Sequence, residues 1–306
     1  MTGSAPTIIP EQDAPRRSTV TITRKDSGMT ATLTTPTARH AVPRPIPNAD
    51  NHIGLRKTVA NSLTMAYRGV VKIKHNPEQL FDVTIQPIIF TLMFTYIFGG
   101  AIAGDVHAYL PIIIPGILVQ TVITTSIVTG TQLREDMDKG VFDRFKSLPI
   151  ARIAALAGAL TADMVRYTIA TVLTIVMGLI MGYRPGGGVL GVAAAAVVII
   201  ACSFAVSWIW ALMGVLMSKA SAVQGISMLI LFPLTFMSSA FVQVSTMPGW
   251  MQAFVNVNPI THLVYACREL MNHGTVGSHL VWSLVGAAVL IVVMAPLTVR
   301  VYMRKA

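Results

Sequence analysis

The sequence predicts an all-α polytopic membrane protein, from its composition, its long apolar segments and the distribution of its basic residues. Of the 306 residues, 53% are hydrophobic and only 12% are charged, and the mean hydropathy is +0.64. In soluble globular chains about a quarter of the residues are charged. A chain this apolar is expected to fold in a lipid bilayer, which excludes an ordinary soluble domain.

Six segments meet the requirement for a membrane-spanning helix, which is about 20 predominantly apolar residues. Charged side chains are nearly absent from them, as expected when each costs about 2.5–3.5 kcal/mol at the centre of the bilayer. The predicted spans are 83–103, 110–131, 167–183, 189–217, 222–242 and 280–299.

Lysine and arginine residues indicate the orientation, because they are enriched in cytoplasmic loops. With the six spans in place, all 23 of them except Arg184 and Arg268 fall on the side of the two chain termini. We therefore expect both termini to be cytoplasmic. The net charge of +10 then reflects topology and contact with anionic membrane lipids, and we expect no nucleic-acid partner.

The chain before the first span divides into two parts. Residues 1–50 are rich in Thr, Ser and Pro without apolar periodicity, which predicts a disordered cytoplasmic tail, and both Met1 and Met29 are candidate starts. Residues 51–78 place apolar side chains at helical spacing, which predicts an amphipathic helix on the membrane surface. A passive anchor and a lever that touches a partner are both open for this helix. Its basic residues are Arg56, Lys57, Arg68 and Lys72.

A charged stretch, residues 133–152, separates the second and third predicted spans. Acidic and basic residues alternate in it, with Gly140 near its middle and Pro149 near its end. Phe142 and Phe145 are unusual in a solvated loop, since exposed aromatic side chains favour the groove of a partner protein. The alternative is a solvated connector whose charges neutralise one another.

This stretch, followed by Gly158 and the run Asp163-Met-Val-Arg-Tyr167, resembles the signature of type-2 ATP-binding-cassette (ABC) exporter permeases, in particular the daunorubicin-resistance permease subfamily. A second motif of that family resembles residues 258–271, Asn-Pro-Ile-Thr-His-Leu-Val-Tyr-Ala-Cys-Arg-Glu-Leu-Met. The resemblance extends from Ile53 to the end of the chain. It implies one transmembrane domain, residues 79–306, preceded by the amphipathic connecting helix.

The resemblance also implies roles for the two motifs. Pro259, Tyr265 and Arg268 would belong to an outer re-entrant region before the last span. The stretch 133–152 would form a cytoplasmic coupling helix that docks on an ATPase subunit. Its coupling residues would be Arg134, Glu135, Asp136, Lys139, Gly140, Phe142, Arg144, Phe145 and Pro149.

We predict no catalytic, nucleotide or metal site in this chain, which would therefore not be an enzyme. The nearest match to a phosphate-binding loop, Gly140 to Ser147, has Phe145 in place of the second glycine. The seven histidines are scattered without the close spacing of metal ligands. By the resemblance, ATP and Mg would be bound by a separate ABC ATPase, a dimer of nucleotide-binding subunits.

Polar and soft side chains in two spans suggest where cargo would bind. Met and Phe adapt their shape to lipophilic ligands, although they are equally common in ordinary helix packing. By the resemblance, the second and fifth spans would line a cleft shared with a second permease chain, identical or paralogous. The candidate cleft residues are Thr121, Thr125, Thr129, Met228, Phe232 and Phe236.

The function predicted from these features is that of the permease subunit of an ATP-driven ABC exporter. The resemblance places it in a bacterial inner membrane, where it would move a lipophilic drug, antibiotic or lipid out of the cytoplasm or inner leaflet. Such transport would confer drug resistance. The alternative is a non-transporting membrane scaffold or immunity protein that docks a soluble partner.

Overall fold

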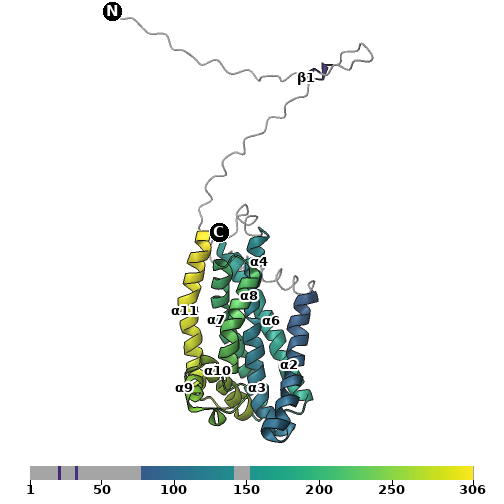
Figure 1. The fold of residues 1–306 in the computed structure, drawn as a ribbon, viewed down its shortest axis with the longest axis vertical. Coiled ribbons are helices and arrows are strands. Elements are labelled where there is room, and N and C mark those ends of the chain that lie inside the picture. The colour runs from purple at the N-terminus through teal and green to yellow at the C-terminus, as the bar shows by residue number, and fades with distance from the viewer. Residues whose placement is uncertain (1–19, 22–31, 34–76, 141–151, 306) are drawn as a thin grey trace, which may run out of the picture. The chain divides into compact units, whose positions relative to one another are not determined.

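The computed structural model describes residues 20–21, 32–33, 77–140 and 152–305 (Figure 1). The chain forms two units, Met1–Asn51 and His52–Ala306. In the first unit, β1 (Val20–Thr21) pairs with β2 (Thr32–Leu33) in antiparallel fashion. The rest of the predicted tail lies outside the described residues. So does the predicted connecting helix up to residue 76, with Arg56, Lys57, Arg68 and Lys72.

Long helices run side by side in the described part of the second unit, and each of the six apolar segments lies mostly within one of these helices or helical runs (Figure 1). They are α2 (Pro77–Ala103), α3 (Val106–Thr125) with its continuation α4 (Ile127–Asp138), α6 (Arg152–Ile180), α7 (Gly188–Leu216), α8 (Ala220–Phe236) and α11 (Ser278–Lys305).

Four of the described helical stretches are long and apolar enough to cross a membrane, namely Val106–Asp138, Leu156–Ile180, Gly188–Leu216 and Ser278–Arg304. The apolar part of α2, Thr84–Gly100, and helix α8 are shorter. This architecture is that of a multi-pass helical membrane protein.

Two helices differ clearly in extent from the spans predicted for them. Helix α6 begins at Arg152, whereas the sequence predicted a start at residue 167, because charged residues usually mark the edge of a span. In the fold, the charges of Asp163 and Arg166 are buried and paired inside the helix bundle. Helix α8 ends at Phe236 and not at residue 242, because Asn258 caps its C-terminal end, donating to the carbonyl of Leu234 at 2.7 Å.

Helix α3 forms the centre of the bundle and α11 lies at its periphery. In an apolar stretch of 18 residues within Val106–Asp138, 78% of the residues are buried. In the corresponding stretch of Ser278–Arg304, only 11% are buried. Tyr109, Ile113 and Ile117 of α3 are fully buried. A peripheral helix with an exposed apolar surface is expected to face lipid tails, which solvate such side chains without cost.

Glycines allow the backbones of α4 and α7 to touch. A Cβ atom added to Gly214 would lie 2.3 Å from the carbonyl oxygen of Gly130, and one added to Gly130 would lie 2.3 Å from the carbonyl oxygen of Trp210. Small residues at such crossings are typical of membrane helix pairs, because close approach increases the van der Waals contact between the helices.

The connecting elements occupy the two ends of the bundle. The short helices α9 (Gly249–Val257) and α10 (Pro259–Arg268), followed by the π-helical turn η2 (Glu269–His273), lie at one end (Figure 1). The 3-10 turn η1 (Val244–Thr246) precedes α9. The C-terminal ends of α4 and α11 lie at the opposite end (Figure 1). The charged residues at the end of α4 and the second sequence motif are therefore separated by the length of the bundle.

Candidate functional site

A pocket of about 160 Å³ opens between α2, α3 and α8. Its wall is mostly apolar and aromatic, with amide and hydroxyl groups contributed chiefly by α3. The lining residues are Gln86 and Phe90 from α2, Gln120, Thr121 and Thr124 from α3, and Met228, Leu231, Phe232, Thr235 and Phe236 from α8.

The structure brings four of the six candidate cleft residues together in this pocket: Thr121, Met228, Phe232 and Phe236. Thr125 and Thr129 lie elsewhere. The Thr125 hydroxyl donates to the Thr121 carbonyl at 2.8 Å, and Thr129 takes part in a polar network with α6.

Six of the ten lining residues were not among the cleft candidates from the sequence. Two of them, Gln86 and Gln120, carry an amide within a predicted span, and this was the available signal, since polar side chains in membrane helices usually have a function or a partner. The other four, Phe90, Thr124, Leu231 and Thr235, look like ordinary span residues, and only the packing of the helices brings them to the pocket.

An aromatic cluster extends from the pocket into the core. The rings of Phe232 and Phe236 stack with centroids 4.2 Å apart, and Phe236 stacks on Phe241 at 5.0 Å. Phe241 in turn stacks on Phe94 of α2 at 4.7 Å. The Phe232 side chain is 58% exposed, so one ring of this cluster is free to stack on a flat ligand.

The helical run formed by α3 and α4 is interrupted at Ser126. The hydroxyl of Ser126 donates to the carbonyl of Ile123 at 2.5 Å and accepts a hydrogen bond from the indole Nε1 of Trp210 at 2.9 Å. Such side-chain bonds to the backbone compete with helical hydrogen bonds and bend helices. The break separates pocket-lining residues on α3 from the charged end of α4.

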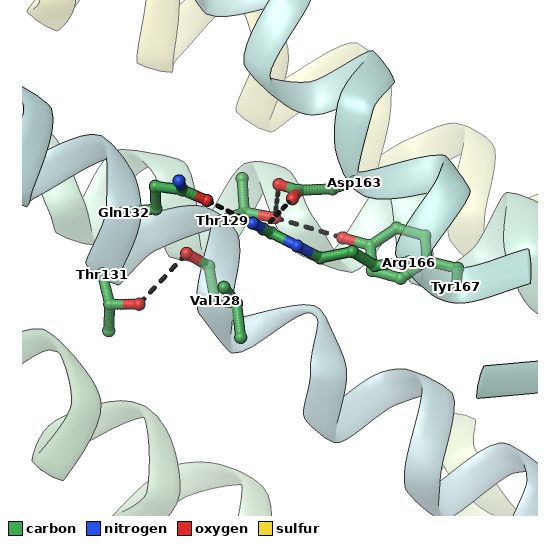
Figure 2. Close-up of polar contacts among 7 residues, drawn as sticks. All are labelled: Val128, Thr129, Thr131, Gln132, Asp163, Arg166 and Tyr167. Atoms are coloured by element: carbon green, nitrogen blue, oxygen red, sulfur yellow. Dashed lines mark hydrogen bonds and ion pairs between the residues drawn. The ribbon is translucent and has the colours of Figure 1, made fainter. Parts of the chain in front are cut away.

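A buried polar network joins α4 to α6 just beyond this break (Figure 2). The carboxylate of Asp163 accepts hydrogen bonds from Arg166 and, at 2.6 Å, from the hydroxyl of Thr129. Arg166 also donates to the Oε1 atom of Gln132 at 2.7 Å, and the Thr129 hydroxyl lies 3.1 Å from the hydroxyl of Tyr167. Asp163 and Arg166 are only 4% and 2% exposed, so the pair is neutralised within the bundle.

The charged stretch predicted to couple to a partner begins as the last turns of α4. Arg134 pairs with Asp138 and donates to the carbonyl of Met217 at 3.0 Å, while Lys139 lies 3.3 Å from Glu135. Asp136 belongs to the same helix. Residues 134–138 therefore belong to the helical run that α3 and α4 form, and Lys139 caps its end.

Gly140 ends α4. Its φ of +63° is in the left-handed region, and its amide donates to the carbonyl of Met137 at 3.1 Å, a glycine-terminated helix end. The remaining predicted coupling residues, Phe142, Arg144, Phe145 and Pro149, lie outside the described residues.

At the opposite end, Arg268 joins three segments. Its guanidinium donates to the carbonyls of Ile112 at 2.8 Å, Ser239 at 2.6 Å and Ala240 at 3.3 Å, so it ties α10 to α3 and to the segment after α8. Burial lowers the pKa of Arg268 to about 10, which leaves it charged at neutral pH. With Tyr265 it lines a second pocket of about 360 Å³.

Pro259 is the first residue of α10, where its missing amide hydrogen has no cost. The preceding residue, Asn258, caps this helix by accepting from the amide of Ile260 at 2.9 Å. Because Asn258 also donates to the end of α8, one side chain fixes the angle between α8 and α10.

Two histidines that are far apart in sequence meet at this end. The Nδ1 atoms of His262 and His279 are 2.9 Å apart, so one of them donates to the other. Burial and the neighbouring His279 lower the pKa of His262. No group of three or more potential metal ligands occurs among the described residues.

The multi-pass helical fold, the apolar pocket and the charged end of the second span define a membrane permease. The chain belongs to the ABC-2 type transporter family, which matches residues 61–272. The resemblance read from the two sequence motifs is thereby confirmed, and the chain is the permease subunit of an ABC transporter. Permeases of this family are generally not enzymes themselves.

Among its relatives is the daunorubicin resistance ABC transporter permease protein DrrB1 of Streptomyces coeruleorubidus, which is 48% identical over 251 residues. That match covers 81% of this chain and 87% of the relative. A probable doxorubicin resistance ABC transporter permease protein, DrrC of Mycobacterium tuberculosis, is 24% identical over 254 residues, covering 83% and 91%. The putative transport permease ycf38 of Cyanophora paradoxa is 24% identical over 210 residues, covering 67% and 72%.

Proposed function

We propose that this permease exports a lipophilic drug, antibiotic or lipid from the cytoplasm or inner leaflet, driven by a separate ABC ATPase. One structural observation carries the proposal: a single helical run lines the pocket through α3 and bears the charged residues through α4. The names of two relatives, which refer to daunorubicin resistance and probable doxorubicin resistance, support a lipophilic aromatic cargo.

The topology that we propose has six spans, with both termini and the end of α4 in the cytoplasm of a bacterial cell. The distribution of basic residues supports it. The apolar part of α8, 17 residues long, rises about 25 Å, which is slightly less than the roughly 30 Å of hydrocarbon. We propose that α9 and α10, with Pro259, Tyr265 and Arg268, form a re-entrant region on the outer side.

The energy for the transport cycle has to come from the partner. Changing a permease from almost fully inward-open to almost fully outward-open requires about 5.5 kcal/mol of differential interaction. The exposed ion pairs at the end of α4 contribute roughly 0–1 kcal/mol each. We therefore assign to Arg134, Glu135, Asp136, Lys139 and Gly140 the role of transmitting movement of the ATPase to α4.

The pocket in one chain is small for a drug. Sites for drug-sized ligands usually measure about 300–1,000 Å³, whereas this pocket holds about 160 Å³. A second permease chain, identical or paralogous, that faces the pocket would complete it. This size difference supports a dimeric permease.

The test uses the transporter assembled in its own membrane. The tagged chain is purified in mild detergent, the accompanying ATPase is identified, and both are expressed together in cells from which inside-out vesicles are made. We expect ATP-dependent accumulation of doxorubicin, followed by its fluorescence, and none with an ATPase variant that binds but does not hydrolyse ATP. A stable complex whose ATPase activity responds to no lipophilic compound would favour the scaffold alternative.

A further inference from the structure

Two polar side chains in the pocket have atoms without hydrogen-bond partners among the described residues. The Oε1 atom of Gln120 and the hydroxyl of Thr121 are both buried and unpaired, although each residue is 7% exposed and lines the pocket. The Nε2 atom of Gln120 is directed to the hydroxyl of Thr124 at 3.4 Å. The amide is thus oriented by its nitrogen, and its buried oxygen has no partner among the described residues.

An unpaired amide oxygen is costly in an apolar pocket inside a membrane protein, because neither hydrocarbon nor aromatic rings can donate to it. A lipid acyl chain in the pocket would leave this oxygen unpaired. A ligand with a hydroxyl or N–H group would satisfy it and gain affinity relative to an otherwise identical ligand without a donor.

The walls around Gln120 restrict the rest of the ligand. Phe232 and Phe236 present stacked rings that suit a flat aromatic system, and Met228 adapts to its edge. No acidic or basic side chain is among the described residues that line the pocket. The recognised group is therefore a neutral donor, since a charged group would lack a counter-ion here.

We propose that Gln120 determines cargo specificity by accepting a hydrogen bond from a neutral hydroxyl or N–H donor on a flat aromatic compound, whose rings stack on Phe232. This assignment rests on the proposed function, because it takes the pocket to be the cargo site. It goes further by naming the feature of the cargo that is recognised and the residue that recognises it.

Two fluorescent probes that differ only in the donor test this assignment: 9-anthracenemethanol and its methyl ether. The full-length chain is placed in lipid nanodiscs, and binding is followed by probe fluorescence against empty nanodiscs. We expect the alcohol to bind about three- to tenfold more tightly than the ether, as one net hydrogen bond predicts. Methionine is close to glutamine in size. In Gln120→Met, the affinity for the alcohol should fall to that for the ether, and the affinity for the ether should not change.

Two control variants separate recognition of the donor from general damage to the pocket. Phe232→Leu should weaken the binding of both probes and keep the ratio of their affinities, because it removes only the stacking surface. Gln86→Met makes the same chemical change on α2, where the glutamine also lines the pocket but has no unpaired buried atom among the described residues, and should keep the preference for the alcohol. Unchanged melting temperatures would exclude misfolding as the cause.

The outcomes separate this inference from the proposed function. Equal binding of the two probes to the parent chain, loss of both probes in Gln120→Met, or no binding of either would overturn the role of Gln120, even if vesicles export doxorubicin. Selective binding with loss of preference in Gln120→Met would support it, even if ATP-dependent export is absent, in which case only the exporter proposal fails.

Discussion

The buried pair of Asp163 and Arg166 offers the sharpest test of how the bundle is held together (Figure 2). In Asp163→Asn the side chain keeps its shape and still has an oxygen for Thr129, but Arg166 loses its carboxylate while remaining 2% exposed. Breaking a buried pair by removing one charge costs about 3–5 kcal/mol, because the remaining charge stays buried without its oppositely charged partner. We expect Asp163→Asn to lose stability by this amount.

The predicted loss translates into a measurable melting temperature. For domains of 150–250 residues, 1 kcal/mol shifts the midpoint by about 2–4 °C, so 3–5 kcal/mol lowers it by about 6–20 °C. The assay is thermal unfolding of the purified chain in detergent. Glu135→Gln is the matched control: it removes a carboxylate from an exposed pair with Lys139, and the midpoint should change by less than about 2 °C.

A double variant tests the reason for the loss. Asp163→Leu combined with Arg166→Met removes both charges and leaves none uncompensated, so its stability should return to within about 1–2 kcal/mol of the parent. A double variant as unstable as Asp163→Asn would refute the electrostatic explanation. A shift under about 2 °C in the single variant would show that the pair is not isolated from water.

Three further changes test other parts of the structure. Gly214→Ala should destabilise the chain and impair its assembly, since the added Cβ would lie 2.3 Å from a backbone oxygen. At Gly225 an added Cβ meets nothing within 4 Å, so Gly225→Ala should be neutral or stabilising. Thermal unfolding measures both effects. Gly140→Ala, at φ +63°, costs about 1–2 kcal/mol locally; it should reduce ATP-driven vesicle uptake while membrane insertion, followed by fractionation, persists. The lowered pKa of His262 means that the folded state disfavours its protonation, so the melting temperature should fall as the pH drops below 6.5, and His262→Asn should weaken that dependence.

For each of these predictions, one specific result would contradict the reasoning. Equal effects of the two alanine substitutions at glycine would contradict the close approach of α4 and α7. Normal uptake in Gly140→Ala would argue against transmission through the end of α4. A melting temperature that rises on acidification would mean that protonation of His262 stabilises the end of the bundle that holds α9 and α10.

Much of the architecture could be predicted because it depends on local composition. The length and apolarity of each segment mark a helix, and the bounds of α7, Gly188–Leu216, agree within a residue with the predicted span. The helix bounds differ from the predicted spans where side-chain interactions in the fold intervene. Arg166 compensates Asp163 inside α6, and Asn258, at the junction of α9 and α10, caps α8.

The candidate site, like the fold, could be predicted only in part from the sequence. Thr121, Met228, Phe232 and Phe236 were expected to lie together and do so. Gln120 was not singled out, because its importance depends on an atom that lacks a partner, and partners are a property of the packed bundle.

The sequence by itself determined the class of protein, the apolar segments and the family, because these depend on composition, segment length and short motifs. Only the tertiary structure decided which faces of the helices meet. Segments such as α3 and α7 are apolar on all sides, so no periodic pattern indicates how they are rotated. Their rotation is set by packing at small residues and by a few hydrogen bonds, and it is this rotation that brings Gln120 to the pocket and His262 to His279.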